Sequence, residues 1–188
     1  MKTHKHLLIL SLVLMLAAGL VACNRGDGVR AAREDRDDTF SPAEQDFMLK
    51  AAQANLAEID LAQMAKQKGQ NDDVKDYANM IEQDHRDALD DLMDIMKAAR
   101  IAPPQSPTPD ARVEIDRMNM LMGAEFEREF VNTMVMNHQK AVDLFRDAYS
   151  VVQNEDLREY ISNKLPKIEM HLQKAHALQS KLFSGKAK

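Results

Sequence analysis

Four ionisable side chains occupy positions at which the surrounding sequence is apolar. Glu58, His85, His138 and His171 each fall on or beside a stripe of apolar residues that recurs with helical spacing. Carboxylate and imidazole groups are ligands for zinc, iron and copper, and four of them complete one coordination sphere. These four residues are therefore candidate ligands of an internal metal site, provided that the elements carrying them bring them to one level.

Those elements are predicted to be long helices. A capping box formed by Ser41 and Glu44 starts the first helix, and Gly69 is a natural end for it. Pro166 lies inside the last helix and is expected to kink it. The apolar periodicity and the caps together predict four long helices, over about residues 42–68, 72–100, 124–152 and 155–183.

The middle of the chain interrupts this pattern. Four prolines between residues 103 and 109 exclude a regular helix, and Thr108 is expected to cap a short helix over about residues 110–122. The turns near Gly69 and Gln153 are short, so each joins two antiparallel helices. The predicted fold is an all-α, up-down four-helix bundle with a Pro-rich middle connection that carries a short helix.

The heights of the four ionisable residues can be counted from the turns. Glu58 lies 12 residues before Gln70 and His85 lies 15 after it, a difference of about 4.5 Å along the axis. His138 and His171 differ by a similar amount about the second turn. Helix axes about 8–10 Å apart would let all four side chains meet near the middle of the bundle.

The N-terminus is predicted to be a targeting signal. Residues 1–22 combine a basic start with an apolar run over residues 7–21, as in a signal peptide. The run ends in Leu20-Val21-Ala22-Cys23, which resembles a bacterial lipobox, and Cys23 is the one cysteine of the chain. We expect Cys23 to be lipidated and to hold the protein to a membrane.

This interpretation also predicts organisation and location. Residues 23–40 are polar and read as the lipidated cysteine and a flexible tether, and residues 41–185 form the bundle. An aspartate directly after the lipidated cysteine would indicate retention in the inner membrane. Asn24 stands there instead, so we expect the outer membrane. The bundle is then expected in the periplasm of the bacterial cell envelope.

Composition excludes several classes of function. The formal net charge of −5 offers no basic surface for nucleic acid. The sequence contains no phosphate loop, no Ser-His-Asp arrangement and no reactive thiol, so hydrolase, kinase and thiol-redox functions have no support. Met118, Met120 and Met122 alternate and therefore point to different sides of a helix, which disfavours a copper(I) thioether site. The sequence does not identify a protein partner.

The pattern also resembles a known family. Its segments are Ala-Asn-Leu-Ala-Glu58-Ile, Met80-Ile-Glu-Gln-Asp-His85, Phe126-Glu-Arg-Glu-Phe, Val135-Met-Asn-His138 and Leu165-Pro166-Lys-Ile-Glu-Met-His171-Leu. Together they are similar to the bacterial envelope family called domain of unknown function 4142, over about residues 41–183. The resemblance implies a ferritin-like bundle and an envelope location. It implies no particular activity, because the family has no assigned reaction.

Two interpretations of the Glu/His cluster stay open. One is a metal site for Fe, Zn or Cu, and the other is a buried hydrogen-bond network that fixes helix register. Glu82 and His85 have the Glu-x-x-His spacing of di-iron bundles, but Val135 and Ile168 stand where a second glutamate would be needed. The sequence therefore favours a non-catalytic binding or stress-protective envelope lipoprotein. The alternative is a metal-binding ferritin-like oxidoreductase or metal-sequestering protein.

Overall fold

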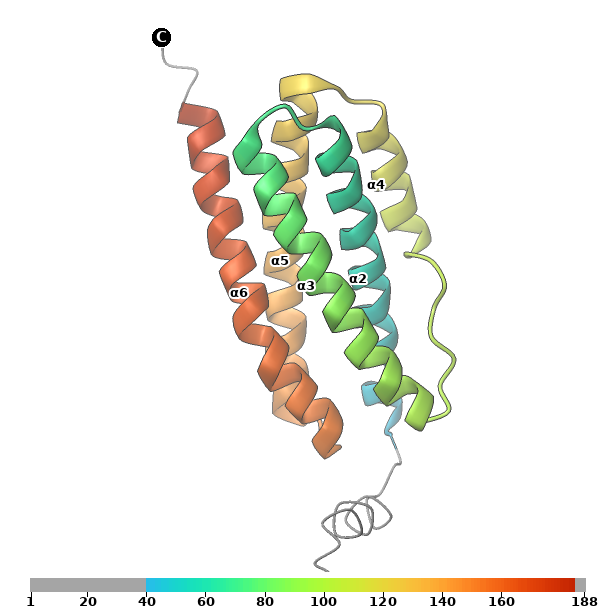
Figure 1. Cartoon of the computed structure of the whole chain (residues 1–188). Coiled ribbons are helices and arrows are strands. Elements are labelled where there is room, and N and C mark those ends of the chain that lie inside the picture. The colour runs from blue at the N-terminus through green and yellow to red at the C-terminus, as the bar shows by residue number, and fades with distance from the viewer. Residues whose placement is uncertain (1–39, 185–188) are drawn as a thin grey trace, which may run out of the picture. The chain divides into compact units, whose positions relative to one another are not determined.

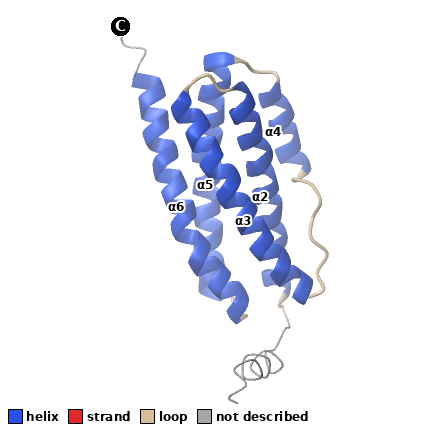
Figure 2. Cartoon of the chain, in the orientation of Figure 1, coloured by secondary structure: helices blue, strands red, loops and turns tan. Residues whose placement is uncertain are grey.

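A computed structural model describes residues 40–184, and within them the secondary structure is entirely helical (Figure 2). The predicted signal peptide, Cys23 and almost all of the tether lie outside the described residues. The helices are α2 (Pro42–Lys68), α3 (Asp72–Ala98), α4 (Pro109–Asn119), α5 (Gly123–Val151) and α6 (Glu155–Ser184). The four predicted long helices and the short one are thus confirmed. Helix α6 continues through Pro166.

The predicted start signals are present as hydrogen bonds. The backbone N–H of Ser41 donates to Glu44 Oε2 at 2.8 Å, and the N–H of Glu44 donates to Ser41 Oγ at 3.3 Å, which completes the capping box. Thr108 Oγ1 accepts from the N–H of Ala111 at 3.2 Å and caps α4. Side-chain caps of this kind satisfy backbone donors that a helix leaves unpaired at its first turn.

The short helix ends earlier than predicted, at Asn119 instead of residue 122. The N–H groups of Met120 and Leu121 bond to the carbonyls of Arg117 and Met118, three residues back, which tightens the last turn. Gly123 then adopts φ +53°, a conformation that side chains disfavour and that redirects the chain into α5. The apolar periodicity of the sequence continues through this turn, so the periodicity did not show where α4 ends.

The long helices form a square in which every neighbouring pair is antiparallel (Figure 1). Helix α2 packs on α3, α3 on α6, α6 on α5 and α5 on α2. The middle connection carries the chain across a diagonal from α3 to α5, so these two helices run in the same direction (Figure 1). Helix α4 lies on this connection and packs against both α2 and α5. The crossover therefore covers part of the groove between α2 and α5.

The apolar core is divided into two layers. One contains Tyr77, Met118, Phe126 and Phe130, and the other contains Phe47, Leu92, Phe145 and Tyr160, each with smaller residues around them. On every long helix the chain passes from one layer to the other through a short polar stretch. Four buried polar residues lie in these gaps, one on each helix: Asn55, His85, His138 and His171. The polar level is therefore enclosed between two apolar layers.

The two helical hairpins repeat each other in sequence. Identical residues recur 83 positions apart, at Glu44/Glu127, Phe47/Phe130, Leu61/Leu144, Ala65/Ala148, Gln70/Gln153, Asn71/Asn154, Asp73/Asp156 and Tyr77/Tyr160. The repeated glutamates do the same work in the structure. Glu127 accepts from the N–H groups of Gln70 and Asn71 in the α2–α3 turn, and Glu44 accepts from those of Gln153 and Asn154 in the α5–α6 turn. Each hairpin thus ties down the turn of the other.

None of the helices within residues 40–184 has both the length and the apolar character needed to cross a bilayer.

Candidate metal centre

Three histidines meet at the centre of the bundle. His85 comes from α3, His138 from α5 and His171 from α6, and one ring nitrogen of each lies within 4.8 Å of the other two. Their ring centroids are 5.3–5.5 Å apart, and all three side chains are buried. The prediction that these three residues share one level is therefore confirmed. Within the described chain they are the group whose donor atoms could hold a metal ion.

Each imidazole is oriented by an oxygen atom on its far side. His85 Nδ1 lies 2.8 Å from Asn55 Oδ1, His138 Nδ1 lies 2.9 Å from the Met134 carbonyl, and His171 Nε2 lies 2.9 Å from Asp84 Oδ2. The Asn55 amide is itself fixed, because its Nδ2 donates to the Ala51 carbonyl at 2.9 Å. Amide, backbone and carboxylate oxygens only accept, so each of these ring nitrogens carries the proton.

In each neutral ring, the opposite nitrogen therefore carries no proton and offers its lone pair. His85 Nε2 and His138 Nε2 face each other at 3.4 Å, and His171 Nδ1 is buried without a hydrogen-bond partner. Two facing lone pairs repel unless a proton or a cation lies between them. Outer hydrogen bonds that fix the tautomer and leave an inner nitrogen free are typical of histidines that bind metals.

Electrostatics favours neutral histidines over a shared proton. Burial, and then the other histidines, lower the pKa of His85 well below its usual value. Burial, followed by His171, lowers the pKa of His138 to about 3. Burial also lowers the pKa of His171, although the hydrogen bond to Asp84 opposes it. The cluster thus presents neutral imidazoles at neutral pH, the form that binds metals.

Glu58, the fourth predicted ligand, is buried on α2 but is not part of the three-histidine group. Its Oε1 accepts from Asn137 Nδ2 at 3.0 Å, and its Oε2 is buried without a partner. Burial raises the pKa of Glu58 to about 8, a rise that the Asn137 hydrogen bond opposes and nearby Glu114 reinforces. Glu58 is therefore uncharged at neutral pH, and it lines the same cavity as His85 and His138.

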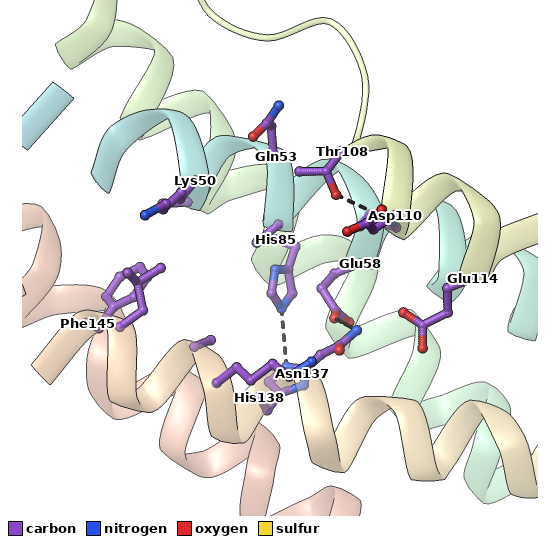
Figure 3. Close-up of a pocket in the computed structure, with 17 residues that line it drawn as sticks. Lys50, Gln53, Glu58, His85, Thr108, Asp110, Glu114, Asn137, His138 and Phe145 are labelled. Atoms are coloured by element: carbon purple, nitrogen blue, oxygen red, sulfur yellow. Dashed lines mark hydrogen bonds between the residues drawn. The ribbon is translucent and has the colours of Figure 1, made fainter. Parts of the chain in front are cut away.

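That cavity, of about 350 Å³, lies in the groove between α2 and α5 and reaches the beginning of α4. Figure 3 shows His85 and His138 on its inner wall, Glu58 beside Asn137, and Glu114 reaching in from α4. Much of the remaining lining is small or apolar, with Ala51, Ala54, Ala57, Ala141, Leu144 and Phe145. The histidine cluster is thus reachable from outside through a mostly apolar passage.

Several other residues that the sequence marked lie away from the cluster. Glu82, despite its spacing to His85, accepts from Lys66, Gln63 and Arg86 at the surface, and these bonds lower its pKa to about 2. The methionines do not gather either, since Met118 is buried while Met120 and Met122 are exposed. A di-iron carboxylate set and a thioether set are therefore not assembled within the described residues.

Sequence reasoning missed the residues that orient the histidines. Asn55 lies three residues before Glu58 on the same apolar face, and Asp84 directly precedes His85. The internal repeat was a usable signal, because the framework residues recur 83 positions apart whereas the site residues do not. Asn55 pairs with His138, Ala88 with His171, and His85 with Ile168. Polar residues that break a repeat of core positions indicate a site.

Fold and site together define a four-helix bundle with a histidine cluster at its centre. The chain belongs to the family described as Domain of unknown function (DUF4142), whose model matches residues 29–178. The fold is similar to the crystal structure of a DUF305 fragment from Deinococcus radiodurans, with a TM-score of 0.68 and 17% identity, covering 75% of this chain and 97% of that one. This likeness fits a ferritin-like bundle. A comparison with curated proteins found no match.

Proposed function

We propose that this protein binds one divalent transition-metal ion through His85, His138 and His171, as a metal-sequestering protein without catalytic activity of its own. The observation that supports this best is the pair of inward nitrogens on His85 and His138, which lie 3.4 Å apart while the opposite nitrogen of each ring faces an acceptor oxygen. Two nitrogens bound to zinc at about 2.05 Å with tetrahedral angles lie about 3.3 Å apart. The spacing therefore suits one ion between them.

Three imidazoles and no thiolate favour Zn(II) or Cu(II) among the candidate metals Fe, Zn and Cu. His171 supplies the third nitrogen, and its hydrogen bond to Asp84 makes it a carboxylate-supported ligand. Glu58 as a fourth ligand stays a prediction of the sequence, because its carboxyl lies on the cavity wall outside the group of three. The surface position of Glu82 supports binding over di-iron oxidation.

The test is metal stoichiometry and affinity. Purified full-length protein, stripped with a chelator, is titrated with Zn²⁺ and with Cu²⁺ by calorimetry, and bound metal is counted by elemental analysis. We expect one ion per chain, and a loss of at least tenfold in affinity in His138→Ala and in His171→Ala. His176 is exposed on the same helix as His171, so His176→Ala is the matched control.

Equal affinities in all four proteins would overturn the proposal and leave the cluster as a network that fixes helix register. A second candidate function, metal-dependent oxidation, would be favoured by turnover of Fe²⁺ or peroxide that His138→Ala abolishes.

Location is the second part of the proposal. We infer that the metal site is held in the periplasm, at the outer membrane, by lipid on Cys23. The support comes from the sequence alone, since Cys23 ends a signal-like apolar run and the polar residues 24–40 separate it from the bundle. Cys23→Ser is expected to abolish incorporation of a labelled fatty acid into the protein and to leave metal binding unchanged. Labelling of the variant equal to that of the unmodified protein would contradict this inference.

A further inference from the structure

The cavity between α2 and α5 owes its space to small side chains. Ala51, Ala54 and Ala57 line it from α2, and Ala141 lines it from α5. The repeat of the two hairpins supplies an internal comparison, because the residues 83 positions away are all larger. In the same order, they are Met134, Asn137, Lys140 and Glu58. The cavity is therefore a local departure from the packing of the other hairpin, as the histidine cluster is.

Helix α4 covers only part of the groove in which the cavity lies. Arg112 of α4 pairs with Asp60 of α2 at 3.1 Å, and the Thr133 hydroxyl of α5 donates to Glu114 of α4 at 3.3 Å. The cavity reaches the beginning of α4 and continues past it to Ala54, which is exposed. A small molecule can therefore enter the cavity without displacing a helix.

The charged residues at the rim of the cavity balance each other. Lys50, Lys140 and Asp110 are exposed, and Glu114 is half-buried. Lys50 already forms an ion pair with Asp46 at 2.7 Å. Two positive and two negative groups favour neither an anion nor a cation, and an ion that enters the apolar part loses its hydration. The cavity therefore favours an uncharged ligand.

The inner part of the cavity offers ring contacts and one acceptor atom. The imidazoles of His85 and His138 lie on its inner wall, and Phe145 lies at one end (Figure 3). Asn137 Nδ2 donates to Glu58 Oε1 at 3.0 Å, a bond that a carboxyl group accepts whether or not it is ionised. This bond fixes the Asn137 amide, whose Oδ1 accepts no hydrogen bond from the described residues. Planar rings pack well against such groups, and a donor on the ring completes the amide.

We propose that this cavity binds a small uncharged aromatic molecule that carries one hydrogen-bond donor. Its ring lies between the alanines of α2 and α5, and its hydroxyl donates to Asn137 Oδ1. The volume of about 350 Å³ is far larger than one water molecule requires and lies within the range of small-molecule sites. The inference does not depend on the proposed metal site, because side chains alone form the walls.

The experiment uses the full-length protein, stripped of metal with a chelator and labelled with ¹⁵N. Benzyl alcohol, benzylamine and benzoate share one ring and are neutral, cationic and anionic at neutral pH, and each is titrated by NMR. We expect saturable shifts of the Ala54 and Ala141 amide signals with benzyl alcohol. Its affinity is expected to be at least tenfold higher than that of either ion. Methanol, which has the hydroxyl but no ring, is expected to cause no saturable shift.

Two variants test the walls and the acceptor. Ala54→Phe places a ring at the exposed edge of the cavity and is expected to weaken benzyl alcohol at least tenfold. Ala177→Phe, at an exposed alanine of α6, is the matched control. Asn137→Met removes the acceptor and is expected to weaken benzyl alcohol about 3- to 10-fold. Toluene, which has no donor, is expected to bind this variant and the unmodified protein equally.

No saturable binding of benzyl alcohol, or binding of benzylamine or benzoate as tight, would overturn the proposal. Unchanged binding in Ala54→Phe would place the ligand elsewhere and overturn it as well. Equal losses of benzyl alcohol and toluene in Asn137→Met would overturn the hydrogen bond to Asn137. Titration of the Ala54→Phe protein with Zn²⁺ is a separate measurement, so a failure of the cavity is distinguished from a failure of the metal site.

Discussion

At the scale of single residues, the site depends on groups that never touch the metal. Each histidine donates a hydrogen bond from one ring nitrogen to an outer oxygen, which belongs to Asn55, Asp84 or the Met134 carbonyl. These bonds determine which nitrogen of each ring faces inward. A histidine whose outer partner is lost can rotate or change tautomer, and its lone pair then no longer points to the centre. The three hydrogen-bond acceptors that hold the histidines are therefore part of the site.

Asp84→Asn is expected to reduce metal affinity about 10- to 100-fold while His171 stays in place. The amide can still accept from His171 Nε2, but it lacks the carboxylate charge that makes the imidazole a stronger ligand. Calorimetric titration with Zn²⁺ measures the effect. Asp87→Asn, at an exposed residue one turn further along α3, is the matched control. An affinity equal to that of the unmodified protein would show that Asp84 serves only the surface ion pair with Lys167.

The contribution of Glu58 to the stability of the folded protein depends on pH in the opposite direction from that of the histidines. Because burial raises its pKa to about 8, the folded protein binds this proton more tightly than the unfolded chain, whose glutamate has a value near 4.5. The stabilising contribution is fully present below about pH 4.5 and is lost as pH rises through 8. For the buried histidines the pKa is lowered, so their contribution is present above about pH 6.5 and is lost as pH falls.

Glu58→Gln is therefore expected to gain stability, relative to the unmodified protein, between pH 5 and pH 8. One pKa unit corresponds to about 1.4 kcal/mol, so the gain over this interval is on the order of 2–4 kcal/mol. Denaturant unfolding of the metal-free proteins at both pH values measures it, and the histidine contributions cancel in the difference. A difference that does not change with pH would mean that Glu58 is ionised in the folded protein.

At the scale of elements, the reciprocal glutamates hold the two hairpins together. Glu127 Oε1 lies 2.6 Å from the N–H groups of both Gln70 and Asn71, and Glu44 Oε1 lies 2.8 and 2.9 Å from those of Gln153 and Asn154. Although burial opposes it, these and the Ser41 hydrogen bonds lower the pKa of Glu44. Each turn thus depends on a helix of the other hairpin, which fixes the register of the four helices at both ends.

Glu127→Ala is expected to lower the free energy of unfolding by about 2–3 kcal/mol, because it leaves two backbone donors without their acceptor. Glu127→Gln keeps an acceptor oxygen and is expected to lose less. Urea unfolding measures both, with Glu125→Ala, an exposed position in the same first turn, as the control. A loss in Glu127→Ala no greater than in the control would show that water replaces the glutamate in this turn.

At the scale of the whole molecule, the polar level joins all four long helices. Asn55, His85, His138 and His171 come one from each helix, and apolar layers lie on both sides of them. A metal ion bound there links helices α3, α5 and α6 directly and α2 through Asn55. Binding is then coupled to the stability of the entire bundle, because the unfolded chain does not assemble the ligands.

Zn²⁺ at about 100 times its dissociation constant is expected to stabilise the folded protein by about 2.7 kcal/mol. For a domain of this size, that corresponds to a rise in Tm of roughly 5–10 °C. Differential scanning calorimetry of the metal-free and loaded proteins measures it. His171→Ala should show a clearly smaller rise and His176→Ala the full one. An equal rise in both variants would place the bound zinc elsewhere.

The sequence by itself determined the helices, their caps, the hairpins and the common level of His85, His138 and His171. These follow from local rules: a 3.6-residue periodicity, side-chain caps, and a rise of 1.5 Å per residue counted from short turns. The end of α4 did not follow, because the apolar periodicity continues through the turn after it. The function of Asn55 and Asp84 did not follow either, because it depends on contacts between helices.

Only the tertiary structure decided which side chains share the centre. It placed Glu82 at the surface with Lys66 and Arg86, and Glu58 beside Asn137 on a cavity wall, although their spacing alone suited either for a ligand. Periodicity gives the face of a helix but not the rotation of that face relative to its neighbours. That rotation is set by packing of the two apolar layers, and it determines which of several inward polar groups meet.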